Sequence, residues 1–285
     1  MKDFVGKVAV VTGGASGIGF ALCERAVEEG MKVVLADVEK GPLAEAERRL
    51  KSNGAEALAV RTDVSSLDDV TALANKTIKK FGSLDLVLNN AGVATYLTTP
   101  IWEHTVDTWE WLIGVNLWGV VNGLKTFVPI MLSQGTECHI VNTSSSVGFV
   151  SGPGVGIYKA TKHAVASISE TLFHELGACD AKVKVSVLAP EMVATGLRQA
   201  RRNMPTHLDE GIKEKSKTEL AFEERAKDMA RMQPREIADE VFSAIREERF
   251  YILPGSGSVA KGAAQRLEDI KSGRPVLLPS LGSER

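Results

Sequence analysis

The chain has 285 residues, 44% of them hydrophobic and 25% charged, which is the composition of an ordinary globular protein with enough apolar residues for a sizeable core. Its formal net charge is −2, and because Lys and Arg are scattered rather than clustered, the sequence offers no basic surface for a nucleic acid. The N-terminus MKDFVGKVAVVTGG contains no apolar signal core, so we expect a cytoplasmic protein. Cys23, Cys138 and Cys179 are far apart and form no CxxC pair, so we expect neither disulfides nor a bound metal.

Short runs rich in β-branched residues alternate with helix-length segments. Nearly continuous apolar strands of this kind belong to parallel sheets that are covered on both faces. The order strand, helix, strand therefore predicts a doubly wound α/β fold with a parallel sheet of the Rossmann type. The predicted strands are 7–12, 32–37, 56–63, 84–90, 138–145 and 183–190, and the predicted helices are 17–30, 42–53, 67–81, 107–133 and 158–177.

One stretch, residues 111–132, is apolar enough to raise the question of a membrane span. A spanning helix needs about 20 predominantly apolar residues. Asn116, Asn122, Lys125 and Pro129 interrupt this stretch. We therefore expect a long buried helix and no membrane contact.

The pattern changes after the sixth strand. Residues 196–233 are charged and prone to form helices, which fits a helical insertion over a substrate site better than a core element. A helix over 234–248 leads into a short strand, RFYIL, and residues 254–285 are a C-terminal tail that we expect to be partly loose. Because no linker splits the chain, we predict one Rossmann-type domain over residues 1–253, with 196–233 as its lid.

The first strand ends in a glycine-rich loop, TGGASGIGF. Gly13, Gly17 and Gly19 have the spacing GxxxGxG, and a helix follows directly. Glycines at such a turn let backbone N–H groups and a helix N-terminus approach a pyrophosphate. A plain strand-to-helix turn would not need three glycines, so the loop predicts a dinucleotide site.

Four motifs follow one another along the chain: TGGASGIG, NNAG at 89–92, NTSSSVG at 142–148 and YKATK at 158–162. Together they cover roughly residues 5–195, and four ordered motifs are far more specific than any one of them. In this order they resemble the short-chain dehydrogenase/reductase family in its single-domain form. The resemblance implies an enzyme that transfers a hydride between a substrate carbon and a nicotinamide dinucleotide.

The resemblance also implies the catalytic residues, which match Asn116, Ser145, Tyr158 and Lys162. Tyr158 would move the proton, Ser145 would hold the substrate oxygen, and Lys162 would bind the nicotinamide ribose. Asn116 would steady the lysine through water. A free tyrosine has a pKa of ~10, and we expect the ammonium one helical turn away to lower the pKa of Tyr158.

Asp37 ends the second strand, where a carboxylate can accept both adenosine ribose hydroxyls. A 2′-phosphate would meet a like charge there. Ser16 and Val38 stand where NADP-preferring relatives often carry a basic residue, so we expect the cofactor to be NAD. NADP is the alternative, because Lys40 is a basic residue close to this position.

Further cofactor contacts follow from the same resemblance. Asp63 and Val64 resemble the pair that contacts adenine, although Asp63 could equally cap the helix that follows it. The complete predicted cofactor set is Gly13, Ser16, Gly17, Ile18, Gly19, Asp37, Asp63, Val64, Asn90, Ala91, Gly92, Tyr158, Lys162, Pro190, Val193 and Thr195.

The loop after the sixth strand departs from the family pattern. Relatives usually have PGxVxT, whereas this chain has PEMVAT with Glu191 in place of the glycine. Val193 and Thr195 would still offer groups to the nicotinamide carboxamide. Glu191 either turns outward, to solvent or to Arg198 or Arg201, or lines the pocket mouth, where its charge would favour the oxidised cofactor.

The expected substrate residues are Ser145, Tyr96, Val147 and Phe149. With Val93, the last three form an apolar set without an obvious carboxylate clamp. They favour an apolar or aromatic secondary alcohol and its ketone as the small-molecule substrate. The alternatives are an NADP-dependent carbonyl reductase and a non-catalytic dinucleotide-sensing regulator, a class that tends to lose the tyrosine or the lysine. The resemblance further implies a homodimer or homotetramer paired through 107–133 and 158–177.

Overall fold

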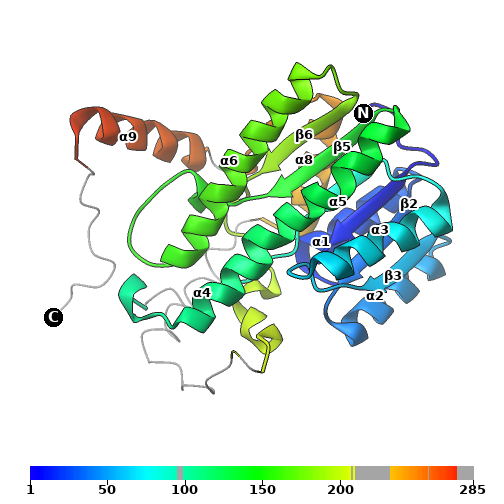
Figure 1. The fold of residues 1–285 in the computed structure, drawn as a ribbon, viewed down its shortest axis with the longest axis horizontal. Coiled ribbons are helices and arrows are strands. Elements are labelled where there is room, and N and C mark those ends of the chain that lie inside the picture. Colours follow the sequence, from blue (N-terminus) through cyan, green and yellow to red (C-terminus); the bar gives the residue numbers. More distant parts are fainter. Residues whose placement is uncertain (95–98, 207, 209–231, 256, 275–285) are drawn as a thin grey trace.

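A seven-stranded sheet lies at the centre of the computed structural model, which describes residues 1–94, 99–206, 208, 232–255 and 257–274. Its strands are β1 Val8–Thr12, β2 Lys32–Asp37, β3 Ala57–Arg61, β4 Leu86–Asn89, β5 Cys138–Thr143, β6 Val183–Leu188 and β7 Tyr251–Ile252. Their order is β3-β2-β1-β4-β5-β6-β7, and every neighbouring pair is parallel (Figure 1). The strand order reverses between β1 and β4, which confirms the doubly wound α/β fold.

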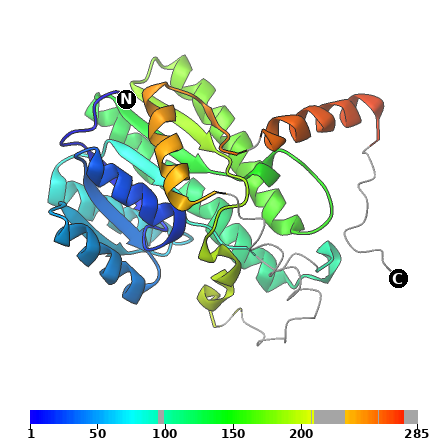
Figure 2. The same cartoon turned by 180° about the vertical axis from the view of Figure 1, so that it is seen from behind.

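Helices cover both faces of this sheet, as Figures 1 and 2 show from opposite sides. The α-helices are α1 Gly17–Glu28, α2 Lys40–Ser52, α3 Leu67–Phe81, α4 Val106–Ile113, α5 Gly119–Gln134, α6 Gly156–Ala178, α8 Pro234–Arg246 and α9 Ser258–Ser272. Side chains of β1 alternate between the two faces: Ala9 and Val11 pack with α1, α2 and α8, whereas Val8 and Val10 pack with α3, α5 and α6. The sheet therefore separates two apolar cores.

The helix predicted over 107–133 is a continuous helical stretch, Val106–Gln134, that includes one π-helical turn, Gly114–Trp118. This is the one helical stretch in the described part of the chain that is long and apolar enough to cross a membrane by length and composition. Asn116 and Asn122 are buried within it, and Asn122 donates a hydrogen bond to the Val64 carbonyl at 2.9 Å. The stretch is thus integrated into a helical layer of the domain.

The segments after β6 contain one helix that the sequence analysis did not predict. A 3-10 helix, Gly196–Asn203, opens the predicted lid, and the greater part of the lid, 209–231, lies outside the described residues. The predicted C-terminal tail contains a regular helix, α9, bounded by left-handed glycines at Gly257 and Gly273. The sequence analysis missed α9 because most of its surface is polar and exposed, so it lacks the apolar periodicity of a core helix.

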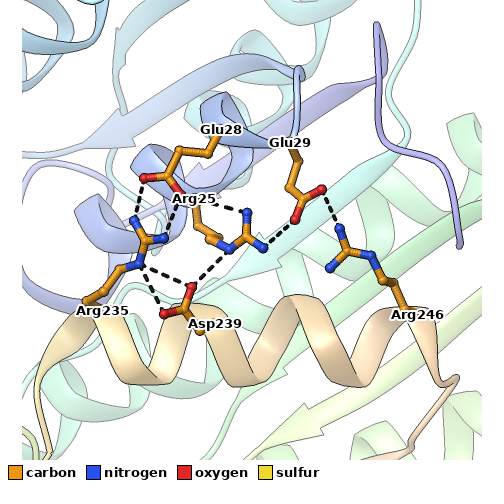
Figure 3. A network of polar contacts seen from close by, with 6 residues as sticks. All are labelled: Arg25, Glu28, Glu29, Arg235, Asp239 and Arg246. Atoms are coloured by element: carbon orange, nitrogen blue, oxygen red, sulfur yellow. Dashed lines mark hydrogen bonds and ion pairs between the residues drawn. The ribbon is translucent and has the colours of Figure 1, made fainter.

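A network of six charged side chains joins α1 to α8 (Figure 3). Arg25 lies at its centre, with Nε 2.9 Å from Asp239 and a guanidinium nitrogen 2.5 Å from Glu29. Arg235 pairs with Glu28 and with Asp239, and its hydrogen bond lowers the pKa of Glu28. The network therefore helps to hold α1, the helix that begins in the glycine loop, against α8.

We expect Arg25→Ala to lower the free energy of unfolding by about 1 kcal/mol, because the network is partly exposed and exposed ion pairs contribute little individually. Urea denaturation at low and high salt measures this loss, which should shrink as salt screens the charges. Arg48→Ala is the matched control, since Arg48 pairs with Glu45 on its own helix. Equal losses in the two variants would contradict a role of the network in joining α1 to α8.

Candidate active site

A cavity of about 550 Å³ opens at the carboxyl ends of the central strands, where the strand order reverses. Ligands of open α/β sheets bind at this kind of position. The loops that follow β1, β2, β3, β4, β5 and β6 all contribute to its wall. Every residue of the predicted cofactor set lines it: Gly13, Ser16, Gly17, Ile18, Gly19, Asp37, Asp63, Val64, Asn90, Ala91, Gly92, Tyr158, Lys162, Pro190, Val193 and Thr195.

The glycine loop forms a tight cradle at one end of the cavity. Gly13 and Gly17 have φ angles of 66° and 55°, in the left-handed region that side-chain-bearing residues rarely adopt. A Cβ atom on Gly19 would lie 2.0 Å from the Gly13 carbonyl oxygen, so only glycine allows this close approach. The N-terminus of α1 opens beside the loop, and its first turn carries no acidic side chain. These features fit a pyrophosphate, which backbone N–H groups and a helix N-terminus would hold.

Asp37 lines the cavity at the end of β2, where the sequence analysis predicted a contact with the adenosine ribose. Its two carboxylate oxygens accept hydrogen bonds from the backbone N–H groups of Ala15, at 3.1 Å, and Glu39, at 3.0 Å. Burial raises the pKa of Asp37, and these hydrogen bonds oppose that rise. The carboxylate is thus held in a fixed orientation at the end of β2.

Glu39 is a cavity residue that the sequence analysis missed. Its carboxylate accepts hydrogen bonds from Arg202, at 2.6 Å, and from Asn203, at 2.7 Å. Burial opposes ionisation of Glu39, but these two bonds lower its pKa. The contact joins the start of α2 to residues far along the chain, and no local motif indicates it.

Asp63 lies in the cavity wall, as a cofactor contact requires, but it is not the N-cap of α3. It lines the cavity, and its carboxylate accepts hydrogen bonds from the Ser65 backbone N–H, at 2.9 Å, and the Ser65 hydroxyl, at 2.6 Å. The N-cap of α3 is Ser66, whose side chain accepts from the Asp69 N–H. Asp63 therefore shapes the turn before α3 without capping that helix itself.

The structure places Ser145, Tyr158 and Lys162 in the wall of the same cavity. Lys162 is buried, and its ammonium donates a hydrogen bond to the Thr143 carbonyl at 2.8 Å. Its Nζ lies 5.5 Å from the centroid of the Tyr158 ring. One helix, α6, positions the tyrosine and the lysine because residues four apart share a helix face.

Burial acts in opposite directions on the pKa values of the two groups. It raises the pKa of Tyr158 to about 12, against a hydrogen bond with Ser145 that lowers it. It lowers the pKa of Lys162 to about 8. The structure therefore does not show the expected lowering of the tyrosine pKa by the lysine, because desolvation penalises the charged form of each side chain.

Asn116 lies within the π-helical turn, where it is fully buried. Its amide accepts a hydrogen bond from the Val93 N–H at 2.8 Å and donates one to the Val93 carbonyl at 2.9 Å. It also donates to the Thr161 hydroxyl at 3.3 Å. Asn116 thus connects the segment after NNAG to α6 by direct contacts. The expected link to Lys162 through water stays a prediction.

The predicted substrate residues occupy different places. Ser145 and Val147 line the cavity, and Tyr96 lies outside the described residues. Phe149 packs edge-on against Tyr251, with ring centroids 6.0 Å apart, and is not part of the cavity wall described here. Apolar lining residues that the analysis missed include Trp111, Val155, Met192 and Leu197. No sequence motif indicates them, because they come from three separate segments of the chain.

Glu191 lines the cavity and also contacts the C-terminal region. Its carboxylate accepts a hydrogen bond from the Ser258 hydroxyl at 2.6 Å. A Cβ atom on Gly255 would lie 2.5 Å from the Glu191 carboxyl carbon, so the side chain lies directly against the Gly255 backbone. Neither of the two placements expected from the sequence included this contact.

Comparisons with known proteins identify the family of this chain. The family model for short chain dehydrogenases matches residues 7–206. The CLA biosynthesis dehydrogenase/reductase of Lactiplantibacillus plantarum is 34% identical over 257 residues, 89% of this chain and 89% of that protein. The C alpha-dehydrogenase of Sphingobium sp. is 31% identical over 255 residues, 89% of this chain and 82% of that protein.

Among solved structures, a short-chain dehydrogenase/reductase from Burkholderia phymatum in complex with NAD superposes with a TM-score of 0.93 at 42% identity. The match covers 99% of this chain and 100% of that chain. Fold, motif order and relatives thus lead to one conclusion. The chain belongs to the short-chain dehydrogenase/reductase family and is an oxidoreductase that acts on hydroxyl or ketone groups with a nicotinamide dinucleotide.

Proposed function

We propose that this enzyme uses NAD to interconvert an apolar or aromatic secondary alcohol and its ketone. The observation that carries the proposal is the arrangement of Ser145, Tyr158 and Lys162 in one cavity with the glycine cradle and Asp37. This arrangement offers a proton-transfer group, a buried cation and a dinucleotide cradle around a single space.

In the proposed mechanism the bound nicotinamide supplies the acceptor or donor of the hydride. Ser145 holds the substrate oxygen and, through its hydrogen bond with Tyr158, favours the phenolate. Tyr158 takes the hydroxyl proton during oxidation and returns it during reduction. Lys162 places a positive charge near the phenol while its ammonium stays bonded to the Thr143 carbonyl. The apolar surroundings strengthen these electrostatic effects because they exclude water.

The preference for NAD is supported by the charges at the adenosine end. Asp37 is oriented to accept ribose hydroxyls, and Glu39 places a second carboxylate on the same wall. Arg202, which also lines this end, is paired with Glu39. A 2′-phosphate would therefore approach two acidic groups, whereas the two free hydroxyls of NAD would meet a hydrogen-bond acceptor.

The substrate class is supported by the wall on the catalytic side. Val93, Trp111, Val147, Val155 and Leu197 are apolar lining residues. Burying an apolar side chain of the substrate against them would be favourable, at roughly 25 cal/mol per Å² of apolar surface. An alcohol with an aliphatic or aromatic body fits this wall better than a strongly polar one.

We further propose that the enzyme assembles as a homodimer or homotetramer through α5 and α6 and acts in the cytoplasm. Leu132 on α5 and Phe173 on α6 are large apolar residues with 42% and 47% of their surface exposed, and Trp118, just before α5, is 52% exposed. Apolar surface of this kind is typical of an interface. The free thiols, including exposed Cys179, suit a reducing compartment.

We expect Tyr158→Phe to lower kcat by at least about 10²-fold, because phenylalanine cannot transfer the proton. NADH affinity, measured by fluorescence titration, should be unchanged. Tyr251→Phe is the matched control. Tyr251 lies on β7, does not line the cavity, and donates a hydrogen bond to Glu170 at 2.9 Å. Near-normal turnover of Tyr158→Phe would overturn the assignment.

We expect Ser145→Ala to shift the pH profile of alcohol oxidation upward, in addition to slowing it. The hydrogen bond with Ser145 lowers the pKa of Tyr158, so its loss raises that pKa, and the phenolate then forms only at higher pH. The measurement is kcat/KM for oxidation as a function of pH in both proteins. A slower variant with an unchanged midpoint would show that Ser145 does not influence the titration of the tyrosine.

We expect Asp37→Ala to lower kcat/KM with NAD by about 10- to 100-fold, the range for a lost hydrogen bond to a charged group, while the value with NADP rises. Asp37→Asn separates the two effects because it keeps one acceptor oxygen and removes the charge. Thermal unfolding of both variants tests whether the backbone around Ala15 remains intact. A wild-type enzyme that already prefers NADP would contradict the proposal.

A further inference from the structure

The C-terminal helix α9 lies apart from the two helical layers. Figures 1 and 2 show it extending away from the sheet, with its N-terminal end nearer the rest of the molecule. Val259, in its first turn, is 4% exposed, whereas Leu267 and Ile270 in its second half are 51% and 66% exposed. The contacts that hold α9 are therefore concentrated in its first turns.

One of these contacts is with the loop that follows the catalytic serine. A Cβ atom on Gly262 would lie 2.4 Å from Cγ1 of Val150, so α9 packs on Val150 through a position without a side chain. Val150 is two residues beyond the 3-10 turn Ser146–Gly148, which has Ser145 as its N-cap. The helix thus supports the segment that carries Ser145 and Val147.

The other contact is with the loop after β6, through Glu191. The Ser258 hydroxyl, at the first residue of α9, donates to the Glu191 carboxylate at 2.6 Å. A carboxylate is favourable at a helix N-terminus because it faces the positive end of the helix dipole. Gly255 has a φ angle of 130° and leaves the space in which the Glu191 side chain lies.

These two loops are themselves joined and both face the cavity. The Ser146 backbone N–H donates to the Pro190 carbonyl at 2.9 Å. Val147 lies on one loop and Met192 on the other, and both line the cavity. A displacement of α9 would therefore act on the substrate side of the site through two adjacent connections.

We propose that Glu191 is a positioning residue that couples α9 to the two active-site loops and thereby fixes the shape of the alcohol pocket. A glycine at this position has no side chain to reach Ser258, so a chain with PGxVxT could not make the connection. The proposed role is to hold the pocket wall in its binding conformation; it includes no proton or hydride transfer. It rests on the function proposed above, because it assigns substrate affinity to the same cavity.

The experiment compares Glu191→Gly, Glu191→Gln and Ser258→Ala with the wild type in the full-length protein. Hydrogen–deuterium exchange follows the amides of 146–150 and 258–263. Steady-state kinetics with 1-phenylethanol and NAD give KM and kcat, and fluorescence titration gives the affinity for NADH. Glu268→Gln is the matched control, because Glu268 lies on α9 but pairs with Lys271 on the same exposed surface.

We expect faster exchange in both segments of Glu191→Gly and a KM for the alcohol raised about three- to tenfold, the range that one net hydrogen bond supports. NADH affinity and kcat should be unchanged. Ser258→Ala should likewise speed up exchange and raise the KM for the alcohol. Glu191→Gln should have nearly the wild-type exchange rates and KM, because its amide oxygen still accepts the hydrogen bond from Ser258. The control should match the wild type.

Two results would overturn the proposal. One is unchanged exchange in both segments of Glu191→Gly. The other is a loss of kcat and of melting temperature with no change in KM, which would indicate general destabilisation. If the wild type does not oxidise the alcohol at all, the proposed substrate class fails, while the exchange measurement still decides whether Glu191 couples α9 to the loops.

Discussion

The hydroxyl of Thr12 makes the contact on which the rest of the site depends. It accepts hydrogen bonds from the backbone N–H groups of Asn90, at 2.9 Å, and Ala91, at 3.1 Å. These bonds join the end of β1 to the end of β4, the two strands between which the strand order reverses. The glycine loop follows one strand and NNAG follows the other, and the Asn90 side chain also donates to the Thr12 carbonyl at 3.0 Å. Together with the pairing of β1 and β4, these bonds hold the two segments of the cavity wall in a fixed relation.

Burial is the second constraint, and it acts on the groups to which we assign catalysis. The same low-dielectric surroundings that strengthen electrostatic interactions raise the pKa of Tyr158 to about 12 and lower that of Lys162 to about 8. Proton transfer near neutral pH therefore requires favourable contacts with the phenolate. Ser145 provides one such contact, and Lys162 contributes a charge that the Thr143 carbonyl keeps in place.

Acidic side chains after β2 and β6 connect the cavity to later parts of the chain. Glu39 accepts hydrogen bonds from Arg202 and Asn203, and Glu191 accepts one from Ser258. Each carboxylate lies beside the cavity, and each partner lies far along the sequence or in another helix. The regions outside the central sheet are thereby attached at the two positions where cofactor and substrate would lie.

The sequence by itself determined the layers of the fold and the motif residues that line the cavity, but not its whole lining. Strand and helix periodicities are local properties, and motifs such as TGGASGIG and YKATK place their side chains through backbone geometry a few residues long. Only the tertiary structure decided that Asn116 binds Val93 directly, that Phe149 packs against Tyr251, and that α9 forms and reaches Glu191. These contacts join side chains from separate elements, and their partners depend on how the layers pack, which no local pattern encodes.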